Sequence, residues 1–290
     1  MTVHGLRRAH RGKRFLVYAV LVWWTLMLAF PMYWLIITSL KTGLALARKA
    51  TYVPFVDFAP SLQAWQYVFV ERLDWAMKPF VNSLIISLST AILSVVLGSA
   101  AGYGLARFSY RIGPWDNGGI ALWFLSQRMF PAAILIIPFL VMYRELQLLD
   151  SRLGLIIAYT GFSTPFVAWM MRDFFAGLPV EIEESALIDG CSRLGVLRHI
   201  AIPLAAPGIV AVFILVMIGA WNEYLFALVL TFSESITVPL FLQIQTQAVQ
   251  TGTQWWNMAA IALVSVIPVV AAGALLERYI TRGLTFGAVK

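Results

Sequence analysis

Six long apolar runs divide the chain, and shorter polar stretches separate them. A helix needs about 20 predominantly apolar residues to cross the hydrocarbon core of a bilayer. The runs therefore predict six membrane-spanning helices within a single transmembrane domain covering residues 1–290. The approximate spans are 15–40, 82–105, 118–142, 153–171, 205–230 and 258–276. This pattern is typical of an all-α integral membrane protein.

Proline and glycine residues interrupt the runs at particular points. Pro31 lies within the first run and predicts a kink there, and Pro131 interrupts the third run. Gly98 and Gly102 lie four residues apart in the second run, and Gly104 follows them. Small residues at this spacing allow the backbone of a neighbouring helix to approach closely, so we predict a helix–helix contact along this face.

The composition agrees with a polytopic membrane protein. Hydrophobic residues make up 60% of the chain and charged residues 12%, and the mean hydropathy is +0.81. Cys191 is the single cysteine, which excludes an intramolecular disulfide. Because the three histidines lie far apart in the sequence, no metal site is predicted. The net charge of +7 lies in clusters beside the apolar runs, as expected of cytoplasmic loops.

The basic residues also predict the orientation of the chain in the membrane. If both termini are cytoplasmic, the cytoplasmic segments contain Arg7, Arg8, Arg11, Lys13, Arg14, Arg107, Arg111, Arg172, Arg193, Arg198, Arg278, Arg282 and Lys290. The external segments then contain Lys41, Arg48, Lys49, Arg72, Lys78, Arg144 and Arg152. This excess favours cytoplasmic termini. A cleaved signal peptide is the alternative for the first run, which is however longer than the usual apolar region of about 7–15 residues.

One polar segment, residues 179–207, lies between two runs long enough to span a membrane. Pro179 suits the first turn of a helix, and acidic residues follow it where the helix dipole favours negative charge. Gly190 suits a left-handed turn that ends this helix, and Ser192 can cap a second short helix. The segment therefore predicts a helix, a tight turn and a helix on the cytoplasmic side. Two amphipathic helices resting on the lipid surface are the alternative.

The residues of this segment resemble the EAA loop of binding-protein-dependent ABC importer permeases. The matching positions are Glu184-Ser185-Ala186, Asp189-Gly190, Pro203-Leu204 and Pro207, with Ser185 in place of the usual alanine. Further similarities are Arg128-Met129-Phe130-Pro131, Trp221-Asn222-Glu223-Tyr224, Gly283-Leu284-Thr285 and Gly287-Ala288-Val289-Lys290. Together they are similar to the carbohydrate branch of the family, and in particular to its smaller, maltose-type second permease.

The resemblance implies a type I ABC importer transmembrane domain in a bacterial-type cytoplasmic (inner) membrane. Such a chain forms half of a pore for a sugar or sugar derivative. Its implied partners are a second permease subunit, two ATPase subunits and an external solute-binding protein. The residues implied to couple to the ATPase are Glu184, Ser185, Ala186, Leu187, Asp189, Gly190, Pro203 and Pro207. A contact with the ATPase is also implied for the tail formed by Gly287, Ala288, Val289 and Lys290.

Motif absences favour a non-catalytic chain. The only Gly-Lys pair, Gly12-Lys13, has Arg7 and Arg14 where a phosphate-binding loop requires glycine and Ser or Thr. The chain therefore binds no cofactor in this interpretation, and ATP and Mg²⁺ belong to the partner ATPases. No H-E-x-x-H or G-x-S-x-G motif occurs either, which disfavours an intramembrane enzyme. A secondary transporter or channel that works without an ATPase remains the alternative.

Two charged residues, Arg128 and Glu223, lie deepest in the predicted spans. Ionisable groups are costly inside a membrane and usually face a cavity or a partner. We therefore take Arg128, Asn222, Glu223 and Tyr224 as candidates for the substrate path. A purely structural ion pair between Arg128 and Glu223 is the alternative.

Overall fold

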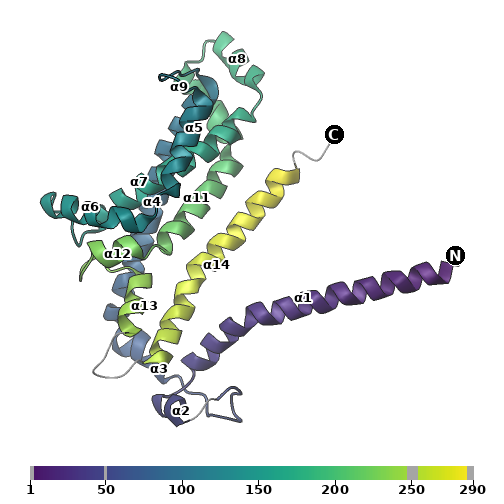
Figure 1. Cartoon of the computed structure of the whole chain (residues 1–290), viewed down its shortest axis with the longest axis vertical. Coiled ribbons are helices and arrows are strands. Elements are labelled where there is room, and N and C mark those ends of the chain that lie inside the picture. The colour runs from purple at the N-terminus through teal and green to yellow at the C-terminus, as the bar shows by residue number, and fades with distance from the viewer. Residues whose placement is uncertain (1–2, 49–50, 247–253, 286–290) are drawn as a thin grey trace. The chain divides into compact units, whose positions relative to one another are not determined.

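The computed structural model describes residues 3–48, 51–246 and 254–285, and helices dominate all three ranges (Figure 1). Four helical stretches are long and apolar enough to cross a membrane alone: Leu16–Ser39 in α1 (Val3–Ser39), α4 (Leu73–Arg107), α7 (Arg152–Ala176) and Trp255–Glu277 in α14 (Trp255–Thr285). Two bent helix pairs raise the number to as many as six. The predicted all-α membrane fold is therefore confirmed.

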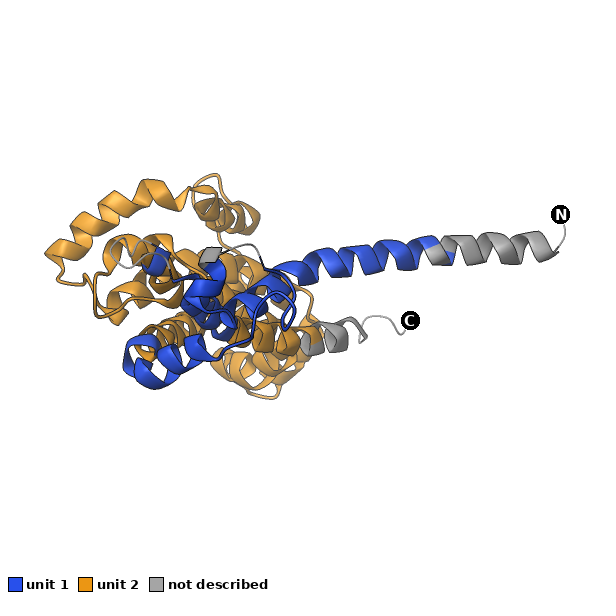
Figure 2. Cartoon of the chain, turned by 90° about the horizontal axis from the view of Figure 1, so that it is seen from below, with its two compact units in different colours: residues 1–76, 245–264 blue, residues 77–244, 265–290 orange. Residues whose placement is uncertain are grey.

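The chain divides into two compact units (Figure 2). The first contains residues 1–76 and 245–264, with α1, α2 (Gly43–Arg48), α3 (Gln63–Gln66) and the π-helix η1 (Tyr67–Glu71). In this unit Lys41 is buried, and its ammonium group donates to the Thr51 carbonyl at 2.6 Å and lies over the rings of Trp34 and Phe58. Burial lowers the pKa of Lys41, and the negative charge of Asp57 partly opposes this. Lys41, which the sequence predicts on an external loop, therefore has a structural role within this unit.

In the second unit, residues 77–244 and 265–290, helices α4 and α7 pack closely at the predicted glycines. A Cβ atom on Gly98 would lie 2.5 Å from the Cβ of Val167, and one on Gly102 would lie 2.8 Å from the Arg172 backbone nitrogen. These two positions confirm the predicted close approach. Gly104 does not take part, since a Cβ there would meet no atom of α7 among the nearest described atoms, but the Tyr110 side chain, whose hydroxyl would lie at 3.4 Å.

The predicted span 118–142 is a broken helix. Helix α5 (Asn117–Ser126) and the 3-10 turn η2 (Gln127–Met129) are followed by α6 (Ala132–Glu145), at an angle of 86° (Figure 1). Proline disfavours the helical conformation in the residue before it, and Phe130 is accordingly extended. Pro131 then serves as the N-cap of α6. The chain turns here because of this proline.

The predicted span 205–230 is also interrupted. Helix α11 (Ala206–Trp221) ends before Asn222, and α12 (Leu225–Leu230) begins after Tyr224. The Glu223 carboxylate accepts hydrogen bonds from the Phe226 amide at 3.0 Å and the Ala227 amide at 3.4 Å. Glu223 therefore caps the first turn of α12, which explains how a helix can restart at this point.

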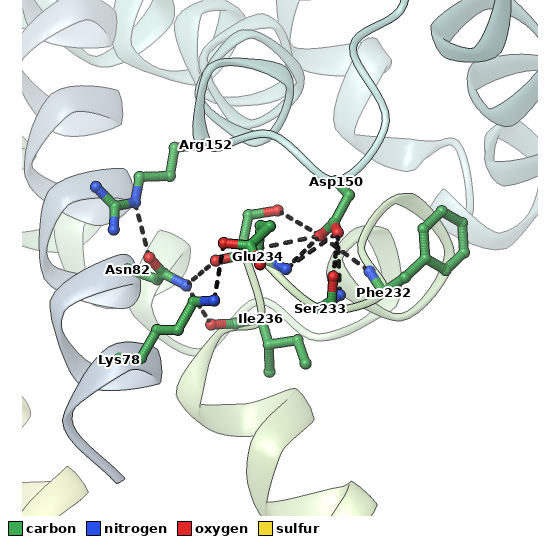
Figure 3. A network of polar contacts seen from close by, with 9 residues as sticks. Lys78, Asn82, Asp150, Arg152, Phe232, Ser233, Glu234 and Ile236 are labelled. Atoms are coloured by element: carbon green, nitrogen blue, oxygen red, sulfur yellow. Dashed lines mark hydrogen bonds and ion pairs between the residues drawn. The ribbon is translucent and has the colours of Figure 1, made fainter. Parts of the chain in front are cut away.

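A polar network fixes the loop between α12 and α13 (Val238–Thr246) (Figure 3). The Asp150 carboxylate accepts hydrogen bonds from the four backbone amides of residues 232–235, at 3.0–3.1 Å, and from two serine hydroxyls. Burial by itself raises the pKa of Asp150, but these hydrogen bonds outweigh burial and hold the pKa far below its ordinary value. Asp150 is thus ionised and organises the loop.

The same loop is tied to the start of α4. The Asn82 amide donates to the carbonyls of Glu234 and Ile236, both at 2.9 Å, and accepts from Arg152 Nε at 2.7 Å (Figure 3). Lys78 forms an exposed ion pair with Glu234 at 2.8 Å. Three segments far apart in the sequence are therefore joined at this end of the unit.

Candidate functional site

The polar segment 179–207 folds as a helix, a tight turn and a helix at one end of the second unit (Figure 1). Helix α8 (Val180–Ile188) follows Pro179, which is the N-cap rather than a first-turn residue. Gly190 has a φ of +88°, a left-handed conformation that favours glycine, as the sequence predicts. The Ser192 hydroxyl accepts from the Gly195 amide at 3.1 Å and caps α9 (Arg193–Val196). The π-helix η3 (Leu197–Ala201) and α10 (Ile202–Leu204) complete the segment.

The side chains around the turn are open to a partner. Glu184, Ser185, Asp189 and Gly190 are exposed, whereas Ala186 and Leu187 are half-buried. Pro203 and Pro207 lie at the other end of the segment, in α10 and in the first turn of α11. Of the candidate coupling residues, the structure therefore exposes Glu184 and Ser185 of α8 together with Asp189 and Gly190 of the turn.

Two large apolar side chains flank this surface without cover from the chain itself. Ile188, the last residue of α8, is 86% exposed, and Leu194, after the turn, is 73% exposed. Isolated exposed apolar residues are ordinary on protein surfaces. Here, however, they lie on both sides of a turn whose backbone is fixed by Gly190 and Ser192. The arrangement offers apolar contacts to a neighbouring protein beside the exposed carboxylate of Glu184.

Glu183, which the sequence did not single out, is the acidic residue that holds α8 in place. Its carboxylate is buried and forms an ion pair with Arg107 at 2.8 Å, and it accepts from the Tyr103 hydroxyl at 2.8 Å. Arg107 also donates to the Leu178 carbonyl at 3.2 Å. Tyr103 and Arg107 are four residues apart and so share one face of α4. Their spacing could have indicated a shared face in the sequence, but not that both side chains meet Glu183.

A second candidate site is a cavity of about 260 Å³ in the second unit. It lies where the two helix breaks meet α7, and both Arg128 and Glu223 line it. Arg128 lies over the ring of Phe166 at 4.6 Å and forms no ion pair with Glu223 in the described residues. The remaining lining residues are Gln127, Phe130, Ala132, Tyr159, Phe162, Ser163, Leu215, Val216, Gly219, Ala220 and Phe226.

The cavity combines aromatic faces with free polar groups. Tyr159 is only 3% exposed, and its hydroxyl lies beside Glu223 but meets no hydrogen-bond partner at acceptable geometry. A buried hydroxyl without a partner is costly and marks a place where a polar ligand or water is accommodated. A neighbouring cavity of about 630 Å³ is lined almost entirely by apolar side chains. The smaller cavity is therefore the better match for a polar solute.

The other two path candidates do not reach this cavity. The Asn222 amide donates back to the Ile218 carbonyl at 2.9 Å and lines a different, smaller hollow with Pro239 and Val266. Tyr224 packs against a cluster of buried apolar residues. Neighbouring residues in a broken helix segment point in different directions, which their sequence positions alone did not reveal. The tail residues Gly287, Ala288, Val289 and Lys290 lie outside the described residues.

Comparisons with known proteins agree with these features. Residues 95–285 match the family described as "Binding-protein-dependent transport system inner membrane component". The chain is 33% identical over 270 residues to the trehalose transport system permease protein SugB of Mycobacterium tuberculosis, covering 89% of this chain and 97% of the relative. It is 32% identical over 273 residues to the diacetylchitobiose uptake system permease protein DasC of Streptomyces coelicolor, covering 91% and 92%.

A solved structure shares the fold. A chain of a bacterial ABC transporter that imports the acidic polysaccharide alginate superposes with a TM-score of 0.77 at 24% sequence identity, covering 94% of this chain and 98% of that chain. The fold likeness extends over nearly the whole length of both chains. The chain belongs to the family of inner membrane components of binding-protein-dependent transport systems.

Proposed function

We propose that this chain is a permease subunit of an ATP-driven importer for a sugar or sugar derivative. It forms half of the translocation pore, with a second permease subunit as the other half. Two ATPase subunits supply the energy and an external solute-binding protein delivers the solute. Family membership supports a role in binding-protein-dependent transport, and the names of the two relatives given above each include a saccharide. The site of action is the cytoplasmic membrane of a bacterial-type cell, with both termini in the cytoplasm.

The observation that carries this proposal is the exposed helix and turn of the segment 179–207. Glu184 presents its carboxylate on α8, and Gly190 makes the turn that follows tight. A basic residue in a cleft of the ATPase would pair with Glu184, and Ile188 would contact the apolar part of that cleft. The tail residues 287–290 add a second contact with the ATPase in this proposal. The chain itself is not catalytic, because ATP is hydrolysed by the partner subunits.

The cavity between the helix breaks is the proposed segment of the solute path. Irregular backbone at membrane depth is tolerated where it lines a cavity, and discontinuous helices mark the binding sites of many transporters. The helix breaks at Phe130–Pro131 and 222–224 both reach this cavity through Arg128 and Glu223. The aromatic rings suit the apolar faces of a sugar ring, and Glu223 and the Tyr159 hydroxyl suit its hydroxyl groups.

Copurification and uptake test the proposal. The tagged chain is expressed from its native chromosomal locus, and the purified assembly is identified by mass spectrometry. We expect the assembly to contain a second permease and two ATPases. Proteoliposomes that also contain the binding protein are expected to take up trehalose, diacetylchitobiose or another of the saccharides tested, and only with ATP.

A charge reversal on α8 locates the contact. Glu184→Lys is expected to abolish copurification of the ATPase, whereas Glu181→Lys, on the exposed first turn of the same helix, leaves the assembly intact. Full assembly and uptake by the Glu184→Lys variant would contradict docking through this surface. Uptake by the chain alone, driven by an ion gradient, would instead favour a secondary transporter.

A further inference from the structure

A buried ion pair joins the exposed helix α8 to the end of α4. The side chains of Arg107 and Glu183 are only 8% and 6% exposed, and Arg107 Nη2 lies 2.8 Å from Glu183 Oε1. The other carboxylate oxygen accepts from the Tyr103 hydroxyl at 2.8 Å. Arg107 Nη2 also donates to the carbonyl of Leu178, two residues before α8. Arg107 thus holds both the first turn of α8 and the chain that leads into it.

Such an arrangement is not explained by stability alone. Desolvation of two charges offsets most of their attraction, and apolar residues of similar volume stabilise a protein equally well or better. What the ion pair and its hydrogen bonds do provide is a fixed geometry. Because three polar contacts must be kept at once, α8 cannot tilt or slide without moving the end of α4.

The packing behind the ion pair continues toward the cavity. The Tyr103 ring meets the ring of Phe175 in α7 edge to face, with centroids 5.3 Å apart. Both belong to a buried cluster that also contains Val212 and Val216 of α11. Val216 lines the cavity as well. An unbroken set of packed side chains therefore leads from α8 through α4 and α7 to the wall of the proposed solute path.

We propose that Tyr103, Arg107 and Glu183 are positioning residues that transmit the movement of α8 to the helices around the cavity. Glu184 is exposed and contacts the ATPase, and its neighbour Glu183, whose side chain is buried, passes the displacement into the membrane domain. This inference rests on the proposed function, since it needs an ATPase that moves α8. It assigns the two adjacent acidic residues of α8 to different tasks, one external and one internal.

An introduced cysteine in the cavity wall reports whether movement of α8 reaches the cavity. Cys191 is the only cysteine of the chain, so Cys191→Ser gives a cysteine-free background, and Ser163→Cys places one thiol in the cavity wall. The assembled transporter, in lipid nanodiscs, is labelled with a water-soluble methanethiosulfonate without nucleotide and after trapping with ATP and vanadate. In the reporter protein, which combines Cys191→Ser with Ser163→Cys, we expect the two labelling rates to differ several-fold.

Glu183→Gln is expected to bring the ratio of the two rates close to one while the ATPase subunits still copurify. The charge-swapped pair Glu183→Arg with Arg107→Glu restores part of the difference, because it restores an ion pair. Glu181→Gln, on the same helix but exposed, leaves the ratio unchanged and serves as the matched control. A purely structural role would lower the yield or the thermal stability without changing the ratio.

A wild-type ratio in Glu183→Gln would overturn the inference. If that variant does not assemble, Tyr103→Phe decides, because it removes one hydrogen bond and keeps the ion pair. A reduced ratio in Tyr103→Phe supports transmission, and an unchanged ratio contradicts it. If the reporter protein without further substitutions shows no nucleotide-dependent change, the proposed ATP-driven function fails rather than the role of these three residues.

Discussion

Replacing Glu183 by methionine is the perturbation whose energetic result follows most directly from the structure. The change leaves the Arg107 guanidinium, 8% exposed, without its counter-ion and the Tyr103 hydroxyl without its acceptor. Removing one partner of a buried ion pair costs about 3–5 kcal/mol, because the other charge stays buried and uncompensated. We therefore expect the free energy of unfolding to fall by about this amount.

Replacing Tyr103, Arg107 and Glu183 together should lower the stability less than replacing Glu183 alone. In the triple variant Tyr103→Phe, Arg107→Met, Glu183→Met, only the Leu178 carbonyl loses a hydrogen bond in this cluster. One buried unsatisfied carbonyl costs about 1–3 kcal/mol. The triple variant is thus expected to be more stable than the single variant and still defective in transport.

Equilibrium unfolding in mixed detergent micelles, followed by tryptophan fluorescence, measures both differences. The single variant Tyr103→Phe measures how much the Tyr103 hydroxyl contributes to the free energy of unfolding. If the triple variant is as unstable as Glu183→Met, or less stable, the uncompensated Arg107 charge does not dominate the loss of stability.

Three further predictions concern other parts of the chain. Gly190→Val forces a β-branched residue into the left-handed region at a cost of about 1–2 kcal/mol, but a Cβ there has no atom of the described residues within 4 Å. We therefore expect normal membrane insertion with loss of ATP-driven uptake, and normal uptake would contradict docking at this turn. Gly102→Ala presses a Cβ against the α7 backbone and should lower the free energy of unfolding by about 1–3 kcal/mol, whereas Gly104→Ala should be nearly neutral. Equal melting temperatures of the two variants would contradict the predicted close packing. Because the pKa of Asp150 is depressed in the folded state, its contribution to stability is complete above the ordinary carboxyl pKa of about 3.9 and is lost as the pH falls toward the lower folded-state value. Asp150→Asn should therefore melt at a lower temperature than the wild type at pH 7 and lose less stability on acidification. A wild-type pH dependence of stability in that variant would exclude Asp150 as its source.

Local signals in the sequence were sufficient for the segment 179–207. The left-handed conformation of Gly190 and the cap at Ser192 follow from residue type and neighbours alone, and the structure has both. The apolar runs likewise predicted the helical membrane fold, because hydrophobic length depends only on consecutive residues. These features need no knowledge of what lies elsewhere in the chain.

Features that depend on distant residues were not predicted. Which of the adjacent Glu183 and Glu184 faces inward depends on Arg107, more than 70 residues earlier in the chain. The helix break after Trp221 was also missed, because no proline marks it and the carboxylate cap of Glu223 is visible only in three dimensions. For the same reason, the sequence placed Arg128 and Glu223 in spans but did not show that they share a cavity with Tyr159.

In the proposed function, an ATPase bound to the segment 179–207 drives solute movement through this chain. The most direct measurement is saccharide uptake by proteoliposomes that contain the purified assembly and its binding protein, with and without internal ATP, for the wild type and Glu184→Lys. We expect uptake only with ATP and only in the wild type. Uptake without ATP, or ATP-driven uptake by Glu184→Lys at the wild-type rate, would contradict ATPase docking at this segment.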